Sequence, residues 1–112
     1  MKIIKKTISK SIILKKYNHF FKTMIKAVVD IEKEIIALDA ELHADLESLL
    51  IKMGCNQKDL WGINLYLKKE KDNWIEYTAL INIRPASGNS GMEIESRRIR
   101  EKINKIVYKL IN

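Results

Sequence analysis

The sequence predicts an α+β domain in which helices cover a small antiparallel sheet. Residues 60–84 alternate apolar with polar side chains on both sides of a charged loop, as the two strands of a hairpin do. Residues 44–53 and 96–111 instead repeat apolar side chains every three or four positions, as amphipathic helices do. Together with a second hairpin at 25–39 and a helix at 10–23, this predicts the order α-β-β-α-β-β-α. We expect a four-stranded sheet built from two hairpins, with helices on one of its faces.

The chain length of 112 residues suits one hydrophobic core, so we expect a single domain over residues 1–112. The longest apolar run near the N-terminus, residues 12–14, is shorter than a signal-peptide core, and no later run approaches the length of a membrane span. Cys55 is the only cysteine, which excludes an intrachain disulfide and fits a reducing compartment. These observations predict a cytoplasmic protein with no membrane span.

The formal net charge of +7 is distributed unevenly along the chain. Residues 1–26 carry eight lysines and no acid, residues 27–66 carry three lysines and eight acids, and residues 67–112 carry ten bases and six acids. A basic excess is typical of proteins that bind nucleic acids or membrane surfaces. Because most of these bases are lysines scattered through a chain rich in Ile and Asn, we expect nucleic-acid binding to be weak and nonspecific at most.

The first helix is expected to follow Ser9, a residue type that caps helix N-termini. Apolar side chains recur behind it at spacings of three and four, namely Ile13, Tyr17, Phe20, Phe21 and Met24. Lysines on the opposite face also fit a basic helix lying on a membrane. We favour a helix that covers the sheet, because three aromatic side chains on one face bury well against strands.

Residues 25–42 fit two structures. A helical spacing joins Val28, Ile31, Ile35, Leu38 and Leu42, whereas a strand spacing joins Ile25, Ala27, Val29 and Ile31. The β-branched residues on either side of the polar segment 32–34 suggest two short strands joined by a tight turn. No Gly or Asn marks that turn, so composition alone leaves both the hairpin and the helix open.

The second helix is predicted from Leu46, Leu49, Leu50 and Met53, which lie at helical spacing and are all expected to be buried. Gly54 follows at the position where a glycine commonly ends a helix. Pro85 is expected to end the second hairpin because it cannot donate a ladder hydrogen bond. Ser96 is a candidate cap for the closing helix.

Four stretches, taken together, resemble a family of short prokaryotic proteins catalogued as a domain of unknown function. They are IKAVVDIEKEI from residue 25, ELHAD from 41, DLWGINLY from 59 and IEYTALINIRP from 75. The similarity extends from about Ile8 to Ile111 and includes Glu47 and Asn89. ELHAD, LWGINLY and INIRP are fairly specific in this order, though none is specific alone.

The family pattern has a glycine in the first turn and two glycines before ELHAD. This chain has Glu34 at the first position and Asp39-Ala40 at the second. The resemblance favours the hairpin at 25–39 over one long helix. It implies no activity.

His43, Asp45 and Glu47 are the candidate catalytic residues. In an extended segment these alternate positions share a face and could hold a divalent metal. In a helix beginning near Ala44, only His43 and Glu47 are neighbours. Asp45 and Glu47 then lie in the first turn, where acidic side chains stabilise the positive end of the helix dipole. Because the leucine spacing favours the helix, we expect no metal and no cofactor, with a partly buried His43 that hydrogen bonds to Glu47.

A possible anion site is predicted around the loop ASGNSG, with Arg84, Asn89, Arg97 and Arg98 as binding residues. Small residues let backbone N–H groups approach an anion closely, and a helix N-terminus with nearby arginines attracts one. The alternative is a mobile loop with two solvated arginines. Trp61 and Trp74 are expected in the sheet and core, since a base-stacking surface needs several exposed aromatics among basic residues.

These observations favour a small module that binds a ligand or a protein partner, including a second copy of itself. The main alternative is an enzyme that uses His43 as acid or base, with Asp45 or Glu47 orienting it and Arg84 holding an anionic substrate. A weaker alternative is nonspecific nucleic-acid binding through the N-terminal lysines. The enzyme requires His43 and Arg84 to face one cleft.

Overall fold

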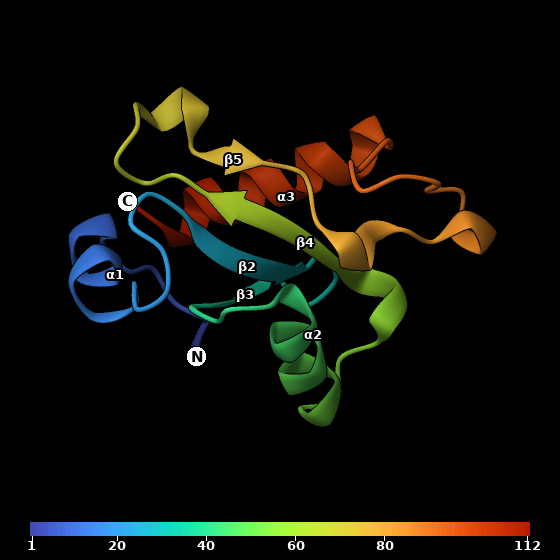
Figure 1. Ribbon diagram of the computed structural model, residues 1–112, viewed down its shortest axis with the longest axis horizontal. Coiled ribbons are helices and arrows are strands. Elements are labelled where there is room, and N and C mark those ends of the chain that lie inside the picture. The colour runs from blue at the N-terminus through green and yellow to red at the C-terminus, as the bar shows by residue number, and fades with distance from the viewer.

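A computed structural model describes all 112 residues and contains three helices and a five-stranded antiparallel sheet of order β1-β3-β2-β4-β5 (Figure 1). The strands are β1 (Lys2–Ile4), β2 (Ile25–Asp30), β3 (Ile35–Leu38), β4 (Leu60–Leu65) and β5 (Ile75–Glu76). The helices are α1 (Lys10–Lys16), α2 (His43–Lys52) and α3 (Arg97–Leu110), and 3-10 turns lie at Gln57–Asp59, Lys71–Asn73, Leu80–Asn82 and Pro85–Ser87. The α+β class is confirmed.

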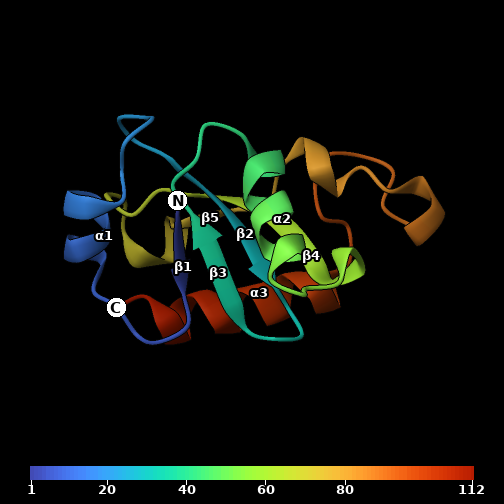
Figure 2. The same cartoon turned by 90° about the horizontal axis from the view of Figure 1, so that it is seen from below.

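Helices cover both faces of the sheet, which corrects the expectation of one covered face (Figure 2). On one face, α1 and α3 pack against alternate residues of the central strands, with Ile13 and Val107 completely buried. On the other face, Leu46 and Leu50 of α2 pack against the remaining strand residues, such as Val28. Because β2 and β3 are buried on both sides, their apolar residues do not alternate cleanly with polar ones. This is the physical reason that the sequence between residues 25 and 42 fits two periods.

The hairpin of β2 and β3 is confirmed, with Val28 opposite Ala37 in the register. Its turn contains no glycine. The Asp30 carboxylate instead accepts hydrogen bonds from the backbone N–H groups of Glu32 and Lys33, both at 2.9 Å. Glu34 completes the turn in the left-handed conformation, with φ of 56°.

A fifth strand, β1, adds to the four predicted ones. It lies at the edge of the sheet and pairs with β3, where Ile4 is opposite Ile36. Three residues are too few to show a strand periodicity, so the sequence does not predict β1. The strand is recognised only by its pairing with the edge of β3.

Helix α1 ends at Lys16, whereas the sequence predicted a helix to residue 23. The Ser9 cap is present, since its hydroxyl accepts a hydrogen bond from the Ile12 N–H. The early end has a tertiary cause. The backbone N–H of His19 donates to the carboxylate of Asp39 at 2.9 Å, which directs the chain away from the helix axis. Phe20, expected on a buried helix face, is 50% exposed.

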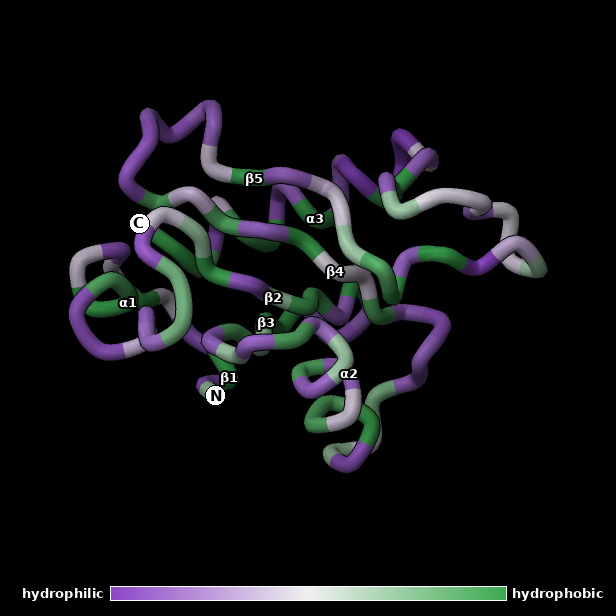
Figure 3. Tube along the Cα trace, in the orientation of Figure 1, coloured by the Kyte–Doolittle hydropathy of each residue, from purple (hydrophilic) through white to green (hydrophobic).

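Two further expectations need correction. The second hairpin is short, because β5 pairs with β4 only at Glu76 and Ile75, and the chain then continues in 3-10 turns. Helix α2 buries Leu46 and Leu50 completely, but Met53 at its C-terminal end is 42% exposed. The buried residues of α2 are His43, Leu46 and Leu50, whereas Leu49 is half-buried. Hydrophilic segments gather in the peripheral loops, such as the one before β5 (Figure 3).

The segment that leads into α1 lies beside the C-terminal end of the chain. The backbone N–H of Ile8 donates to the Leu110 carbonyl at 2.8 Å, and that of Lys10 donates to the Asn112 carbonyl at 3.0 Å. None of the helices combines the length and the apolar character needed to cross a membrane.

Candidate functional site

His43 is the first residue of α2 and is only 9% exposed. Its ring nitrogen Nε2 lies 2.8 Å from the carbonyl oxygen of Ile63 on β4 and donates a hydrogen bond to it. Burial lowers the pKa of the imidazole, and the hydrogen bond to Ile63 opposes this shift. The neutral ring with its proton on Nε2 therefore joins the start of α2 to the central strand.

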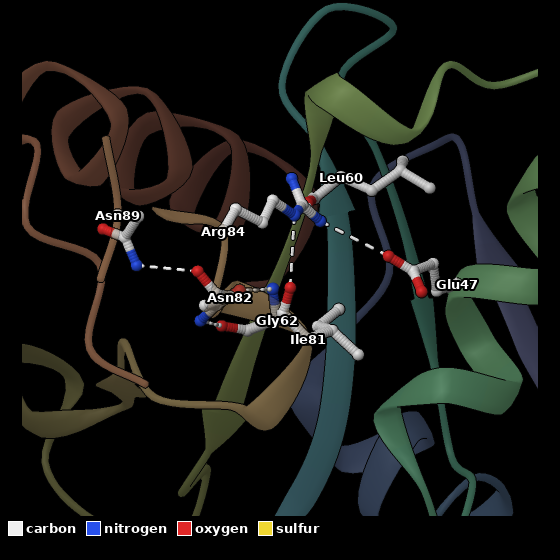
Figure 4. Close-up of polar contacts among 7 residues, drawn as sticks. All are labelled: Glu47, Leu60, Gly62, Ile81, Asn82, Arg84 and Asn89. Atoms are coloured by element: carbon white, nitrogen blue, oxygen red, sulfur yellow. Dashed lines mark hydrogen bonds and ion pairs between the residues drawn. The ribbon is translucent and has the colours of Figure 1, made fainter. Parts of the chain in front are cut away.

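The carboxylates of Asp45 and Glu47 point in different directions. Asp45 lies in the first turn of α2 and is exposed. Glu47 is mostly buried and pairs with Arg84, whose Nη2 lies 3.3 Å from its carboxylate oxygen (Figure 4). The expected hydrogen bond between His43 and Glu47 is replaced by these two separate contacts. No group of three or more His, Cys, Asp or Glu side chains has the arrangement of a metal site.

Arg84 reaches from the end of the 3-10 segment across the edge of β4. Its guanidinium donates to the carbonyl of Leu60 at 2.6 Å and to that of Ile81 at 3.2 Å, and stacks 4.8 Å above the Trp61 ring. Burial lowers its pKa, and the charge of Glu47 counteracts the shift. Arg84 is therefore engaged by α2, β4 and its own loop at once.

Asn82 takes the place of a neighbouring strand beside β4. Its side-chain oxygen accepts the N–H of Gly62 at 2.8 Å, and its side-chain nitrogen donates to the Gly62 carbonyl at 2.9 Å (Figure 4). Gly62 has to be small here, because an added Cβ would lie 2.5 Å from the Cβ of Ala79. The stretches LWGINLY and INIRP thus interlock across the open part of the β4 edge.

Asn89 is buried within its own loop and contributes to the same interlocked structure. Its side-chain nitrogen donates to the carbonyls of Asn82, Gly91 and Glu93, and its oxygen accepts the N–H of Glu95. All its hydrogen-bonding groups have partners within the chain.

The four residues of the predicted anion site do not meet in one place. Asn89 is buried and Arg84 is mostly buried, and both are held in the contacts just described. Arg97 and Arg98 are exposed at the start of α3, where Arg97 pairs with Glu101 at 3.3 Å. Ser96 caps this helix as predicted, by accepting the N–H of Ile99.

The side chains of His19 and Asp39 form a pair that the sequence did not predict. The pair lies on the side of α2 away from Arg84. Asp39 follows β3, is 3% exposed, and has φ of 72°, a conformation that non-glycine residues adopt at a cost. Its carboxylate accepts the backbone N–H of His19 and contacts the Nδ1 atom of the same residue. Asp39 and Glu34 both have positive φ angles, a conformation that glycine adopts without the cost a side chain adds.

Two hollows adjoin this pair. A cleft of about 500 Å³ lies between Phe20, residues 39–41 and the exposed side of α2. Its lining residues are Met1, Phe20, Asp39, Ala40, Glu41, Asp45, Ser48, Leu49 and Lys52. A second, open hollow of about 430 Å³ is lined by Asn18, His19, Phe20, Phe21, Lys22 and Lys68. Phe20 lines both hollows, whereas His43 and Arg84 line neither.

The fold and this arrangement define a small α+β domain with a polar network between α2 and β4 and two adjoining surface hollows. The chain belongs to DUF5674, a family of proteins of unknown function, whose model matches residues 2–110. No curated protein and no solved structure matches the chain. The family assignment confirms the resemblance drawn from the sequence.

Proposed function

We propose that the protein is a ligand-binding module whose ligand occupies the cleft between Phe20, residues 39–41 and α2. The size of this cleft, about 500 Å³, is the observation that carries the proposal, because cavities that hold small ligands have similar volumes. The other candidate site residues form hydrogen bonds or ion pairs within the chain, and we assign them to stabilising the fold. They are His43, Glu47, Arg84 and Asn89.

The lining of the cleft favours a ligand with a positive charge and an apolar portion. Glu41 and Asp45 are exposed acids at this place, and Lys52 is the one lysine there. Phe20 and Leu49 supply apolar surface between the charges. An organic amine, or a lysine side chain of a peptide, has both features.

The acid–base enzyme built on His43 has less support than the binding module. The His43 ring is buried, its Nε2 proton is used in the bond to Ile63, and Arg84 is turned toward Glu47 and Leu60. A substrate would have to displace these contacts before either side chain could act on it.

The proposal is tested by titrating the ¹⁵N-labelled protein with benzylamine and, in parallel, with the uncharged benzyl alcohol. Amide shifts are expected to change around residues 39–49 and Phe20, with benzylamine binding several-fold more tightly than the alcohol. Asp45→Asn is expected to weaken benzylamine binding. Asp72→Asn, which changes another exposed aspartate outside the cleft, serves as the matched control.

Two results would contradict the proposal. One is a set of shift changes that lies away from the cleft or is absent at millimolar ligand. The other is an equal loss of affinity in the two aspartate variants, which would indicate attraction by the general charge of the protein rather than by this cleft.

A further inference from the structure

We propose that the hollow beside His19 is an anion-binding site that takes a phosphate or carboxylate group, with Asp39 acting as the residue that positions the His19 ring. This hollow shares Phe20 with the cleft along α2, but the proposal does not depend on the function proposed for that cleft. Three basic side chains from two parts of the chain line it: His19, Lys22 and Lys68.

The His19 ring has a fixed orientation although it is exposed. The Asp39 carboxylate binds the Nδ1 side of the ring with one oxygen and the His19 backbone N–H with the other. The buried Asp39 carboxylate therefore holds both the Nδ1 atom and the backbone N–H of His19. Nε2 is left as the ring nitrogen that a ligand in the hollow can meet.

The backbone of Asp39 has a left-handed conformation that residues with a side chain rarely adopt. Its φ of 72° is unfavourable for a residue with a side chain. A glycine would adopt the same backbone shape without this cost, but it would leave His19 unheld. The strain is compatible with folding because the carboxylate makes two contacts to His19.

The two lysines come to the hollow from different elements. Lys22 belongs to the loop before β2, and Lys68 follows β4. The Lys68 ammonium donates to the Lys22 carbonyl at 3.1 Å, which ties the two segments together at the hollow. An ammonium group has three donors, so this bond leaves others for an anionic oxygen.

Asn18 adds a polar group that lacks a partner within the chain. Its side-chain oxygen is buried without a hydrogen bond, and the residue lines the hollow. Because this oxygen is shielded from solvent, the anionic oxygens of a phosphate or carboxylate in the hollow meet the three basic side chains.

The test is a calorimetric and NMR titration of the full chain with inorganic phosphate, and separately with acetate, at low ionic strength and one fixed pH near 6.5. Lys22→Gln and Lys68→Gln are each expected to weaken phosphate binding about threefold to tenfold. Lys58→Gln, which changes an exposed lysine that does not line the hollow, is the matched control and is expected to change binding less than twofold. Tighter binding of acetate than of phosphate would assign the site to carboxylates.

Asp39→Gly separates a built site from a merely basic surface. This change removes a negative charge, so a surface that attracts anions only by its charge would bind phosphate more tightly. The positioning role predicts the opposite, a several-fold loss of affinity, because His19 is no longer held. Glycine suits the positive φ, and a thermal melt checks that the variant is folded.

Equal affinities of the Lys22, Lys68 and Lys58 variants would overturn the proposal, and so would tighter binding by Asp39→Gly. Loss of binding in His19→Gln, together with shift changes confined to residues 18–22 and 68, would support it. Binding that spreads over all exposed lysines would show nonspecific charge attraction instead.

Discussion

The side-chain amide of Asn82 pairs with both the N–H and the carbonyl of Gly62, as a neighbouring strand would. Beside β4 the strand β5 covers only two residues, so the edge next to Gly62 has no strand partner. The Asn82 amide satisfies this edge inside the protein, where it is completely buried. The contact explains why an asparagine and a glycine occur in the two stretches that carry the family resemblance.

Replacing Asn82 with alanine is expected to destabilise the protein strongly. The change leaves two buried backbone groups of Gly62 without partners, each at a cost of about 1–3 kcal/mol. We therefore expect the free energy of unfolding, measured by urea denaturation, to fall by about 2–5 kcal/mol. Asn56→Ala changes an exposed asparagine with no side-chain capping bond, and its effect should stay within about 0.5 kcal/mol. Similar losses in the two variants would refute this account of Asn82.

Gly62→Ala is expected to destabilise the protein by about 1–3 kcal/mol because of overpacking. The new methyl group would approach the Ala79 Cβ to 2.5 Å and the Ile81 Cγ1 to 3.1 Å. Gly91→Ala meets no atom within 4 Å and is the matched control. Adding Ala79→Gly to Gly62→Ala should recover part of the loss in thermal melting. Without recovery, the steric contact with Ala79 would not be the cause.

The Glu47–Arg84 pair is expected to show a coupling energy in a double-mutant cycle. Removing one partner leaves the other mostly buried, since their side chains are 14% and 13% exposed. Glu47→Gln should cost about 1–3 kcal/mol in the free energy of unfolding, less than for a fully buried pair because solvent reaches both groups. Arg97→Gln, which breaks an exposed pair with Glu101, should cost less than about 0.5 kcal/mol. Additive effects of Glu47→Gln and Arg84→Gln would show that the pair contributes no coupling.

The stability of the protein is expected to fall at mildly acidic pH because of His43. Burial lowers the pKa of its ring below the ordinary value of 6.5, so the unfolded chain binds the proton more readily. The His43 contribution is complete above about pH 6.5 and is lost as the pH falls through the lowered folded value. Thermal melts from pH 7.5 to 5.0 should show a smaller decline for His43→Gln than for the unchanged chain. His19 is present in both proteins, so their difference isolates His43. Parallel pH curves would contradict the assignment.

Any affinity for nucleic acid is expected to be nonspecific and sensitive to salt. Lys5 and Lys6 are exposed. They lie near the C-terminal end of α3, because the hydroxyl of the neighbouring Thr7 donates to the carbonyl of Lys109. With about three phosphate contacts, affinity should fall tenfold or more between 50 and 150 mM salt, as measured by anisotropy with a labelled duplex. Replacing Lys5 and Lys6 with Gln should weaken binding more than Lys33→Gln with Lys58→Gln. Tight, sequence-selective binding at the higher salt would contradict this expectation.

Much of the local structure follows from the sequence. The residues of α2, α3 and β4 have one dominant period, and Ser9 and Ser96 cap helices as residues of their type do. The β2–β3 hairpin was left open by composition, because a strand covered on both faces has no alternation. The family resemblance, rather than the pattern itself, favoured the correct structure there.

The candidate site was less predictable than the fold. His43, Glu47, Arg84 and Asn89 were recognisable as unusual polar residues, but their partners are backbone carbonyls and side chains far along the chain. His19 and Asp39 are twenty residues apart, and neither belongs to a recognisable pattern. A lone histidine in a predicted helix gives no indication that a buried carboxylate will hold it.

The sequence by itself determined the α+β class, the family and the positions of the two longer helices, because these depend on periodicity and capping within short segments. Only the tertiary structure decided the fifth strand, the early end of α1 and the contacts that Asn82, Arg84 and Asp39 make. The reason is physical. A strand edge, a buried carboxylate and a hollow are created when distant segments meet, and the free energy of those contacts exceeds the local preferences of the residues that form them.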